Sequence, residues 1–271
     1  QQQVAVGRVV AQARAADVIR DIRVYADTMD RLQSLPMTSP VAQVLDRLEA
    51  TNTTTPWPLI LFLHATAEVP ERQAEIGTLA IDSFIMRRAI CRMATKDYNR
   101  LFGTLLGEIK SGEPAQAGEL LAAALAGQAA DSRLWPDDAT FAAGLMNPDL
   151  YNDVVRARLR TLLVGLENHL LTSKAEPTVP HRAVAKMFTI EHVMPVKWET
   201  NWPLPWNATD EEVALRQRDV HRLGNLTLAT KSLNSTLSNA AWSTKRHTLQ
   251  THSLARLTTG SILTFPEGTH G

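Results

Sequence analysis

Residues 189–195 read Thr-Ile-Glu-His-Val-Met-Pro and place an acidic residue, Glu191, directly beside a histidine, His192. The apolar pattern around this pair predicts a β-strand over residues 187–193. Pro195 indicates that the strand soon ends, because proline has no N–H group to donate to a sheet. The stretch therefore predicts a short strand that carries two ionisable side chains near its end.

A second strand is predicted downstream. Residues 221–228 read His-Arg-Leu-Gly-Asn-Leu-Thr-Leu, and over residues 223–229 leucines alternate with polar side chains. A long loop rich in tryptophan and proline separates the two strands, and Asn234 precedes a final helix over residues 242–249. The predicted order is strand, long loop, strand and helix.

The first part of the chain predicts helices. Apolar residues recur at helical spacing near residues 4–34 and again over residues 150–171. The run from Trp57 to Ala67 is apolar almost all round, which is typical of a buried helix. Two prolines mark residues 172–180 as a linker. We therefore predict a mainly α protein, with a helical bundle domain at residues 1–175 and a smaller domain at residues 176–271.

Composition limits the class of protein. The formal net charge is zero, so attraction to nucleic acid has to come from local groups of Lys and Arg. The one cysteine, Cys91, cannot form an internal disulfide and is interpreted as a reduced packing residue. The longest apolar run, residues 58–63, is far shorter than the roughly 20 residues that span a bilayer, and no signal peptide opens the chain. We expect a cytoplasmic protein with no membrane partner. Because the chain begins at Gln1 without an initiator methionine, we also expect a piece of a longer polypeptide.

The chemistry suggested by these residues is hydrolysis of a phosphodiester. Such a site needs a base that takes a proton from water and a cation that stabilises charge on the phosphate. A histidine supplies the base, and a hard cation such as Mg²⁺ needs little more than one carboxylate and one amide oxygen, which Glu191 and Asn234 offer. Neighbouring residues of a strand point to opposite faces, so Glu191 and His192 share a site only if the backbone bends there.

Three motifs resemble a known family. Ile-Glu-His-Val-Met-Pro at 190–195, Gly-Asn-Leu-Thr-Leu at 224–228, and Leu-Asn-Ser-Thr-Leu-Ser-Asn at 233–239 followed by Lys-Arg at 245–246 are similar to the HNH nuclease domain that closes GmrSD-type modification-dependent restriction enzymes and the related phosphorothioate-sensing SspE proteins. The resemblance is strong over residues 189–246. The helical part resembles the same C-terminal regions more loosely.

The resemblance implies a small ββα-metal (HNH) fold for the second domain. It implies that His192 is the general base, that Glu191 and Asn234 bind the metal ion, and that Asn225 braces the base from the second strand. The HNH domain of CRISPR effector nucleases has a similar start and two similarly separated asparagines, which favours Asn234 over Asn239. No second histidine stands at the ligand position, which favours Mg²⁺ or Mn²⁺ over a zinc-like site.

Each assignment has a structural alternative. Asn225 is also typical of a turn after glycine, and Asn234 is also typical of a helix cap. His221 either touches phosphate or pairs with acidic neighbours. We predict that the tryptophans at 198, 202 and 206 pack the loop rather than stack on bases. Basic residues near the site are candidates for phosphate contacts, with an ordinary solvated surface as their alternative; they are Arg222, Lys231, Lys245 and Arg246.

The leading hypothesis is a metal-dependent DNA endonuclease that serves as the effector of a modification-sensing restriction or antiviral defence protein. Its partners are then DNA and an upstream nucleotide-hydrolysing sensor domain of the same polypeptide, with a homodimer as a further candidate assembly. The alternative is a non-catalytic DNA- or partner-binding helical module with a degenerate nuclease domain. A third reading makes residues 1–170 a bundle that restrains the nuclease, and it is compatible with the first.

Overall fold

The computed structural model describes residues 2–172 and 185–264, with side chains over residues 15–171 and 186–264. The chain divides into two compact units. Unit 1 comprises residues 1–45, 54–83 and 95–134, and unit 2 comprises residues 46–53, 84–94 and 135–271. In the described part of the chain both units are built mainly from helices, which confirms the predicted mainly α class.

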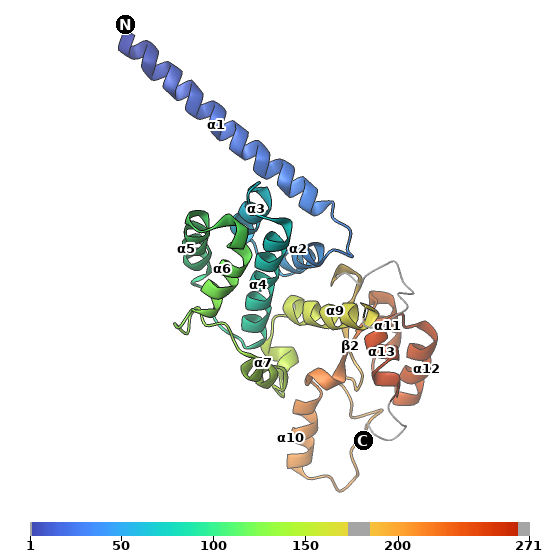
Figure 1. Ribbon diagram of the computed structural model, residues 1–271. Coiled ribbons are helices and arrows are strands. Elements are labelled where there is room, and N and C mark those ends of the chain that lie inside the picture. Colours follow the sequence, from blue (N-terminus) through green and yellow to red (C-terminus); the bar gives the residue numbers. More distant parts are fainter. Residues whose placement is uncertain (1, 173–184, 265–271) are drawn as a thin grey trace. The chain divides into compact units, whose positions relative to one another are not determined.

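Unit 1 is a bundle of helices around a leucine- and isoleucine-rich core. Helices α3, α5 and α6 pack side by side next to α4 (Figure 1). Leu63, Ile81, Leu105 and Leu121 are fully or almost fully buried among them. The elements are α1 (Gln2–Gln33), the start of α2 (Pro40–Ala50), α3 (Trp57–Ala65), most of α4 (Glu71–Ile90), α5 (Tyr98–Ser111), the 3-10 turn η1 (Pro114–Gln116) and α6 (Ala117–Ala126).

The start of α6 is fixed to α4 by one side chain. The Gln73 Oε1 atom of α4 accepts hydrogen bonds from the backbone N–H groups of Gly118 and Glu119, at 3.0 and 3.1 Å. These donors belong to the first turn of α6, where no helical partner exists. A Cβ atom at Gly118 would lie 2.0 Å from the Gln73 carbonyl oxygen, so only glycine allows the two helices to approach this closely.

Unit 2 combines two short strands with helices. It includes the end of α2 and the end of α4. Its remaining elements are α7 (Asp138–Leu145), α8 (Leu150–Asp153), α9 (Arg156–Thr172), η2 (Ala185–Met187), β1 (Thr189–His192), α10 (Asp210–Asp219), η3 (Leu223–Asn225), β2 (Leu226–Ala229), α11 (Lys231–Leu237), α12 (Trp242–His252), α13 (Arg256–Thr259) and η4 (Ile262–Thr264).

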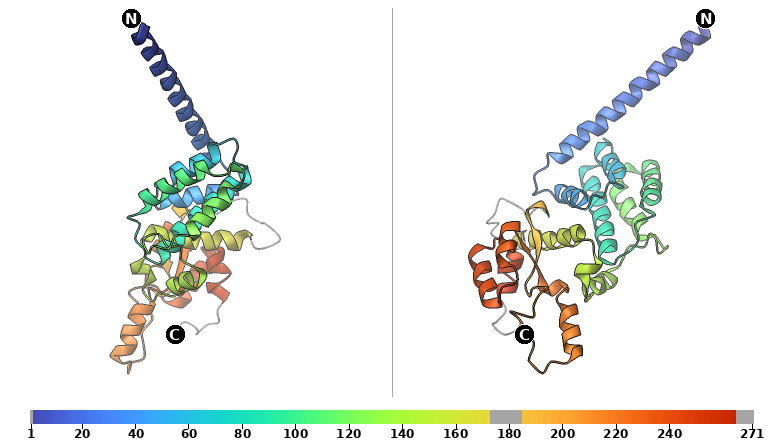
Figure 2. Two further views of the ribbon diagram at one scale, coloured as in Figure 1. Left: turned by 60° about the vertical axis from the view of Figure 1, so that its left-hand side comes forward. Right: turned by 180° about the vertical axis from the view of Figure 1, so that it is seen from behind.

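The strands β1 and β2 form an antiparallel pair whose two faces meet different helices. Thr189 lies opposite Ala229, and His192 lies opposite Leu226. Because side chains alternate along a strand, the pair has two faces. The α9 face is named after α9, which packs against β2 (Figures 1 and 2), and the α12 face is named after the helix whose Lys245 side chain contacts it. The α9 face consists of Ile190, His192, Leu226 and Leu228, and the α12 face consists of Thr189, Glu191, Thr227 and Ala229.

The α9 face carries the apolar core of unit 2. Leu226 and Leu228 pack with Leu159 and Leu163 of α9, and Leu228 has no exposed surface. Burying each such leucine stabilises the fold by about 1.5 to 3 kcal/mol. The helix α9 therefore completes the layer that the two strands begin.

A buried carboxylate ties α13 to α9. Glu167 of α9 is only 2% exposed, and its two oxygens accept the backbone N–H groups of Arg256 and Leu257 at 2.8 and 2.7 Å. These groups open α13, where a negative charge stabilises the helix N-terminus. On the other side, the hydroxyls of Thr258 and Thr227 are 2.7 Å apart, so α13 is held to β2 as well.

The observed division of the chain differs from the predicted domains 1–175 and 176–271. Residues 135–171 belong to unit 2, because α8 and α9 share their core with Leu226 and Leu228 of β2. The predicted boundary and most of the linker lie outside the described residues. The amino-acid composition changes near that linker. The hydrophobic core of unit 2 nevertheless includes residues of α8 and α9, which precede the linker.

Local interactions fix the start of α7, α5 and a further helix in the loop between the strands. Asp137 caps α7, since its side chain accepts the Thr140 N–H group. Asp97 precedes α5 without a side-chain cap hydrogen bond, and its carboxylate forms ion pairs with Arg100 and Arg133. The loop between the strands also contains a helix, α10, which begins with a capping box in which Thr209 and Glu212 hydrogen-bond to each other's backbone N–H groups.

No helix in residues 2–172 and 185–264 combines the length and apolar character needed to cross a membrane.

The shared core makes a testable prediction. Leu228→Ala should lower the free energy of unfolding of unit 2 by about 2 to 5 kcal/mol, because it leaves a cavity between β2 and α9. Five of the six tryptophans lie in unit 2, so urea unfolding followed by tryptophan fluorescence reports on it. The control Leu254→Ala, at a side chain that is 90% exposed, should change the free energy by less than about 0.5 kcal/mol. Equal effects of the two changes would contradict the packing described here.

Candidate active site

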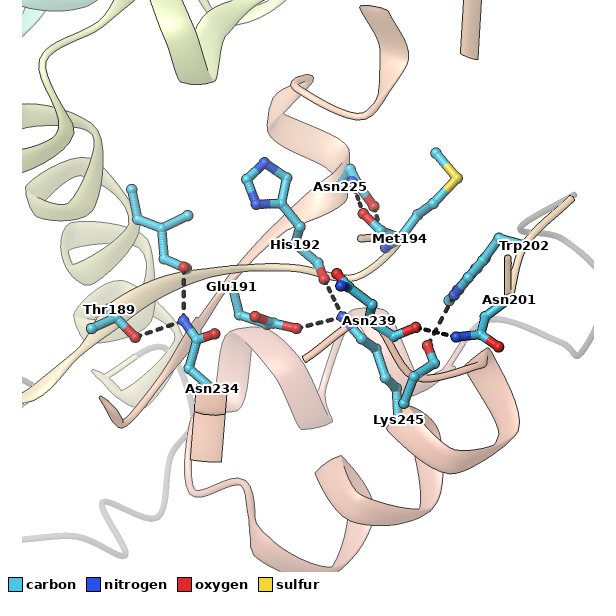
Figure 3. Close-up of polar contacts among 12 residues, drawn as sticks. Thr189, Glu191, His192, Met194, Asn201, Trp202, Asn225, Asn234, Asn239 and Lys245 are labelled. Carbon is cyan, nitrogen blue, oxygen red and sulfur yellow. Dashed lines mark hydrogen bonds and ion pairs between the residues drawn. The ribbon is translucent and has the colours of Figure 1, made fainter. Parts of the chain in front are cut away.

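Glu191 and His192 leave β1 on opposite faces (Figure 3). Glu191 extends toward α12, where it contacts Lys245. The His192 ring lies instead against Tyr151, with the two ring centroids 4.3 Å apart. The strand does not bend enough to bring the two neighbours to one side. The predicted set of Glu191, His192 and Asn234 is therefore divided between the two faces.

On the α12 face a buried ion pair dominates. The Lys245 ammonium donates to Glu191 Oε1 at 2.6 Å and to the backbone carbonyl oxygen of His192 at 2.7 Å. Lys245 is 1% exposed and Glu191 is 5% exposed. Burial raises the pKa of Glu191 and lowers the pKa of Lys245, and in each case the partner's charge opposes that shift. The sequence analysis gave Lys245 as a candidate for contacts with DNA phosphate, whereas in the structure it is the buried ion-pair partner of Glu191.

Asn234 lies on the same face and holds β1 to α11. Its Nδ2 group donates to Thr189 Oγ1 at 2.9 Å and to the Ile190 carbonyl oxygen at 3.0 Å. The alternative that Asn234 caps a helix is wrong, because Thr230 caps α11 through the Leu233 N–H group. The Asn234 amide therefore links the helix to the strand that carries Glu191.

Glu191 and Asn234 do not fit a divalent metal ion in this arrangement. A metal ligand offers negative charge or a lone pair, but the Glu191 carboxylate is already neutralised by an ammonium group at 2.6 Å. A second cation at that carboxylate would meet the charge of Lys245 at short range. Across the described residues, no three His, Cys, Asp or Glu side chains gather as a metal-binding group.

On the α9 face His192 is part of a cluster of rings. Tyr151 stacks on His221, with the two ring centroids 5.6 Å apart. The centroids of the His192 and His221 rings are also 5.6 Å apart, and these two rings are nearly perpendicular to each other. His192 Nε2 and His221 Nδ1 are buried and have no hydrogen-bond partner among the described residues. Buried polar atoms normally have a partner, so these two nitrogens are suited to bind water or a ligand group.

The His192 imidazole is kept neutral. Burial lowers its pKa from 6.5 to about 4, and the nearby charges of His221, Lys245 and Arg156 act in the same direction. A neutral imidazole has one ring nitrogen that can accept a proton. His192 therefore has the protonation state of a general base at neutral pH.

Sequence reasoning missed two members of this cluster, Tyr151 and Arg156. The Arg156 guanidinium lies 3.2 Å from the centroid of the Tyr151 ring, so a cation stands next to the ring that contacts His192. Both residues precede the recognised motifs in the chain, in α8 and at the start of α9. No local spacing marks them, because only the packing of α8 and α9 on β1 and β2 brings them to His192.

Asn225 braces the segment that follows His192. Its Oδ1 atom accepts the Met194 N–H group at 2.8 Å, and its Nδ2 group donates to the carbonyl oxygens of Met194 and Val220, at 2.9 and 2.8 Å. The Asn225 carbonyl oxygen also accepts the Val193 N–H group at 2.9 Å. Asn225 lies at the end of η3, one residue before β2 rather than on it, and its role in bracing the base stays a prediction.

The other predicted phosphate-binding residues have different surroundings. Lys231 is exposed at the start of α11. The exposed Arg222 side chain pairs with Asp219 at 2.6 Å, and Arg246 is half-buried on α12. Of the four predicted cations, Lys231 and Arg222 thus have side chains that an external phosphate can reach readily.

The loop tryptophans mostly pack, as predicted. Trp198 and Trp202 are buried, and the Trp202 indole donates to the Ala240 carbonyl oxygen at 3.0 Å. Trp206 differs, because 99% of it is exposed.

A neutral, buried histidine held at the end of a short antiparallel strand pair, with cations close by, defines a candidate hydrolase site in a mainly helical unit. The comparison with protein families makes this class specific. Residues 135–262 match the family described as GmrSD restriction endonucleases, C-terminal domain, and this part of the chain belongs to that family. No curated protein and no solved structure shows significant similarity to the chain. The matched range begins at residue 135, where the continuous part of unit 2 also begins.

Breaking the buried ion pair should destabilise unit 2. Lys245→Met leaves the Glu191 carboxylate buried without its cation, at an expected cost of about 3 to 5 kcal/mol in the free energy of unfolding. Combining it with Glu191→Gln should recover part of that loss, because no unpaired charge remains. The control Lys231→Met, at an exposed lysine, should leave stability almost unchanged. Urea unfolding measures all four proteins, and a loss below about 1 kcal/mol for Lys245→Met would speak against the pair.

The pKa of His192 predicts how stability depends on pH. Between pH 6.5 and about 4 the unfolded chain binds a proton at this residue and the folded chain does not, so the free energy of unfolding falls as the pH is lowered. The expected contribution is about 2 kcal/mol between pH 7 and pH 5. Urea unfolding at both pH values should give a smaller loss for His192→Gln than for the parent. The same loss in both proteins would show that His192 does not carry the effect.

Proposed function

We propose that this chain is a DNA endonuclease that hydrolyses phosphodiester bonds with His192 as its general base. The observation that carries the proposal is the family match over residues 135–262, which includes a buried histidine kept neutral beside two cationic residues. The resemblance of residues 189–246 to HNH nucleases supplies the subtype, and the order β1, β2 and α11 agrees with a ββα arrangement.

In the proposed reaction, a water molecule at His192 Nε2 gives up a proton to the imidazole as its oxygen attacks phosphorus, and the bond from phosphorus to one bridging sugar oxygen breaks. The leaving sugar oxygen takes a proton from solvent. The low pKa of His192 keeps that nitrogen able to accept the proton down to acidic pH. Two groups hold the backbone of the base in place. Lys245 donates to the His192 carbonyl oxygen, and Asn225 fixes the Met194 backbone just beyond it.

The side chains around the base favour a phosphate ligand. Arg156 brings a guanidinium to the Tyr151 ring, and the unpartnered His221 Nδ1 atom lies in the same cluster as His192 Nε2. Guanidinium groups and imidazole N–H donors stabilise negative charge that develops on phosphate oxygens. We therefore propose that Arg156 and His221 contact the phosphate that is attacked by the water molecule at His192.

Mg²⁺ or Mn²⁺ stays part of the proposal as the cofactor that the HNH resemblance implies. Such an ion stabilises charge on the phosphate when it is bound. Because Glu191 is held by Lys245, we assign it the role of anchoring β1 and assign no step of the reaction to a Glu191 and Asn234 metal pair.

The wider setting of the nuclease follows from the resemblance alone. We propose that it is the effector of a restriction or antiviral system, governed by an upstream nucleotide-hydrolysing sensor that recognises modified DNA, with phosphorothioation as one candidate modification. On this view the 271-residue chain cuts DNA without strong preference, since recognition lies mainly in the sensor.

A second candidate is a non-catalytic DNA-binding module. The observation that favours it is the Lys245 ammonium at the carboxylate where the resemblance expects a metal ion. It predicts DNA binding without cleavage under any divalent ion.

Plasmid cleavage distinguishes the two. With Mg²⁺ or Mn²⁺ the parent chain should nick or cut supercoiled plasmid, and His192→Ala should be slower by about 10² to 10⁴-fold, because it removes the base. The matched control His247→Ala replaces an exposed histidine of α12 and should keep the parent rate. Equal rates for the parent and His192→Ala would overturn the assignment of the base. DNA binding without cleavage by the parent would favour the second candidate.

A further inference from the structure

A cavity of about 540 Å³ opens in unit 2 beside the end of β1. Its volume lies in the range of roughly 300 to 1,000 Å³ that is usual for small-molecule sites. Its walls come from the end of α7, the segment after β1, the loop between the strands, and the stretch from α10 to η3. The Glu191 and Lys245 pair and the His192 ring do not line it.

The cavity nevertheless adjoins the proposed base. Val193 and Met194, which line one wall, are the two residues that follow His192. Successive Cα atoms are 3.8 Å apart, so this wall begins within about 8 Å of the His192 backbone. Arg222, on another wall, directly follows His221 of the ring cluster. If a linear polymer is bound at His192, its adjacent residue can therefore enter the cavity.

Part of the cavity lining is apolar. It contains the Trp202 indole, which is held in place by its hydrogen bond to Ala240, together with Met194 and Met146. Met146 is 75% exposed although it is a large apolar residue. A fixed indole and two thioether side chains in one lining suit a planar aromatic ligand, which can pack against the part of the indole that faces the cavity.

The lining also carries positive charge. Arg222 is balanced by Asp219, which also lines the cavity. Arg216 forms no ion pair with any described residue; its guanidinium contacts Met194 Sδ at 3.3 Å and lies 5.8 Å from the Trp198 ring centroid. The cavity thus keeps one unbalanced guanidinium next to an apolar wall. A ligand that complements it has a planar apolar part and an anionic part, as a nucleotide has.

We propose that this cavity binds one nucleotide of the DNA substrate, with its base turned out of the stack against Trp202 and its phosphate at Arg216, next to the phosphodiester that reaches His192. The proposal rests on the proposed nuclease function. Enzymes that act on DNA turn single nucleotides out of a duplex when a pocket receives the base. Contacts in the cavity would then make cleavage sensitive to the nucleotide beside the cut.

The test is photo-cross-linking of the full 271-residue chain carrying His192→Ala, so that the DNA stays intact. The probe is a short DNA duplex in which 5-iododeoxyuridine replaces thymidine, and cross-linked peptides are identified by mass spectrometry. Two tryptophans give the readout. Trp202 is 8% exposed and lines the cavity, whereas Trp206 is 99% exposed. Cross-links at Trp202, Met146 or Met194 are expected, and cross-links at Trp206 alone would overturn the proposal.

Arg216 and Arg218 provide a matched pair of variants. Both lie in the last turn of α10, but only Arg216 lines the cavity. Arg216→Ala should lower the cross-link yield at Trp202 by about tenfold, which corresponds to losing a charge-assisted hydrogen bond. Arg218→Ala should keep the yield. Equal yields from the two variants would contradict the assignment of the phosphate to Arg216.

Plasmid cleavage separates a failure of this proposal from a failure of the nuclease function. Cleavage that depends on His192, together with no cross-link in the cavity, overturns the nucleotide site and leaves the nuclease intact. Cross-links at Trp202 with no cleavage by the parent chain keep the nucleotide site and overturn the nuclease.

Discussion

The hydrogen bonds of the Lys245 ammonium are the constraint on which the geometry of the site depends. One ammonium group, withdrawn almost entirely from water, donates both to the Glu191 carboxylate and to the His192 carbonyl oxygen. Charged groups are costly to bury, so each depends on the other for its place in the fold. The contact joins α12 to the end of β1 and so orients the strand that carries His192. Because Glu191 is drawn toward α12, its neighbour is directed to the α9 face, into the cluster formed with Tyr151 and His221.

The residues of the motif on the two faces of the strand pair have different roles. Glu191, Asn234 and Lys245 hold strand and helices together on one face. On the other face, burial keeps the His192 imidazole neutral and leaves its Nε2 atom without a partner among the described residues. Residues that stand side by side in the sequence therefore serve different purposes, which follows from the alternation of side chains along a strand.

The sequence allowed the mainly α class and the two strands to be predicted, because these depend on local periodicity and on recognisable motifs. It did not reveal the role of Lys245, because a lysine on a helix is normally solvated and only tertiary contacts bury it here. Nor did it identify Tyr151 and Arg156, which reach His192 through the packing of α8 and α9. The helix α10 was missed although Thr209 and Glu212 formed a visible capping box, since the tryptophans and prolines before it suggested a continuous loop.

The core shared by α9 and the strands also decides how much of the chain can be moved as a module. The recognisable motifs occupy residues 189–246, yet Leu226 and Leu228 are covered by residues that come before residue 172. A piece cut to the motifs alone would present this apolar face to water and invite association with other chains. A gene fusion that transfers this domain to another protein therefore has to carry α8 and α9 with it, and the smallest exchangeable part is set by the core of unit 2 rather than by the motif.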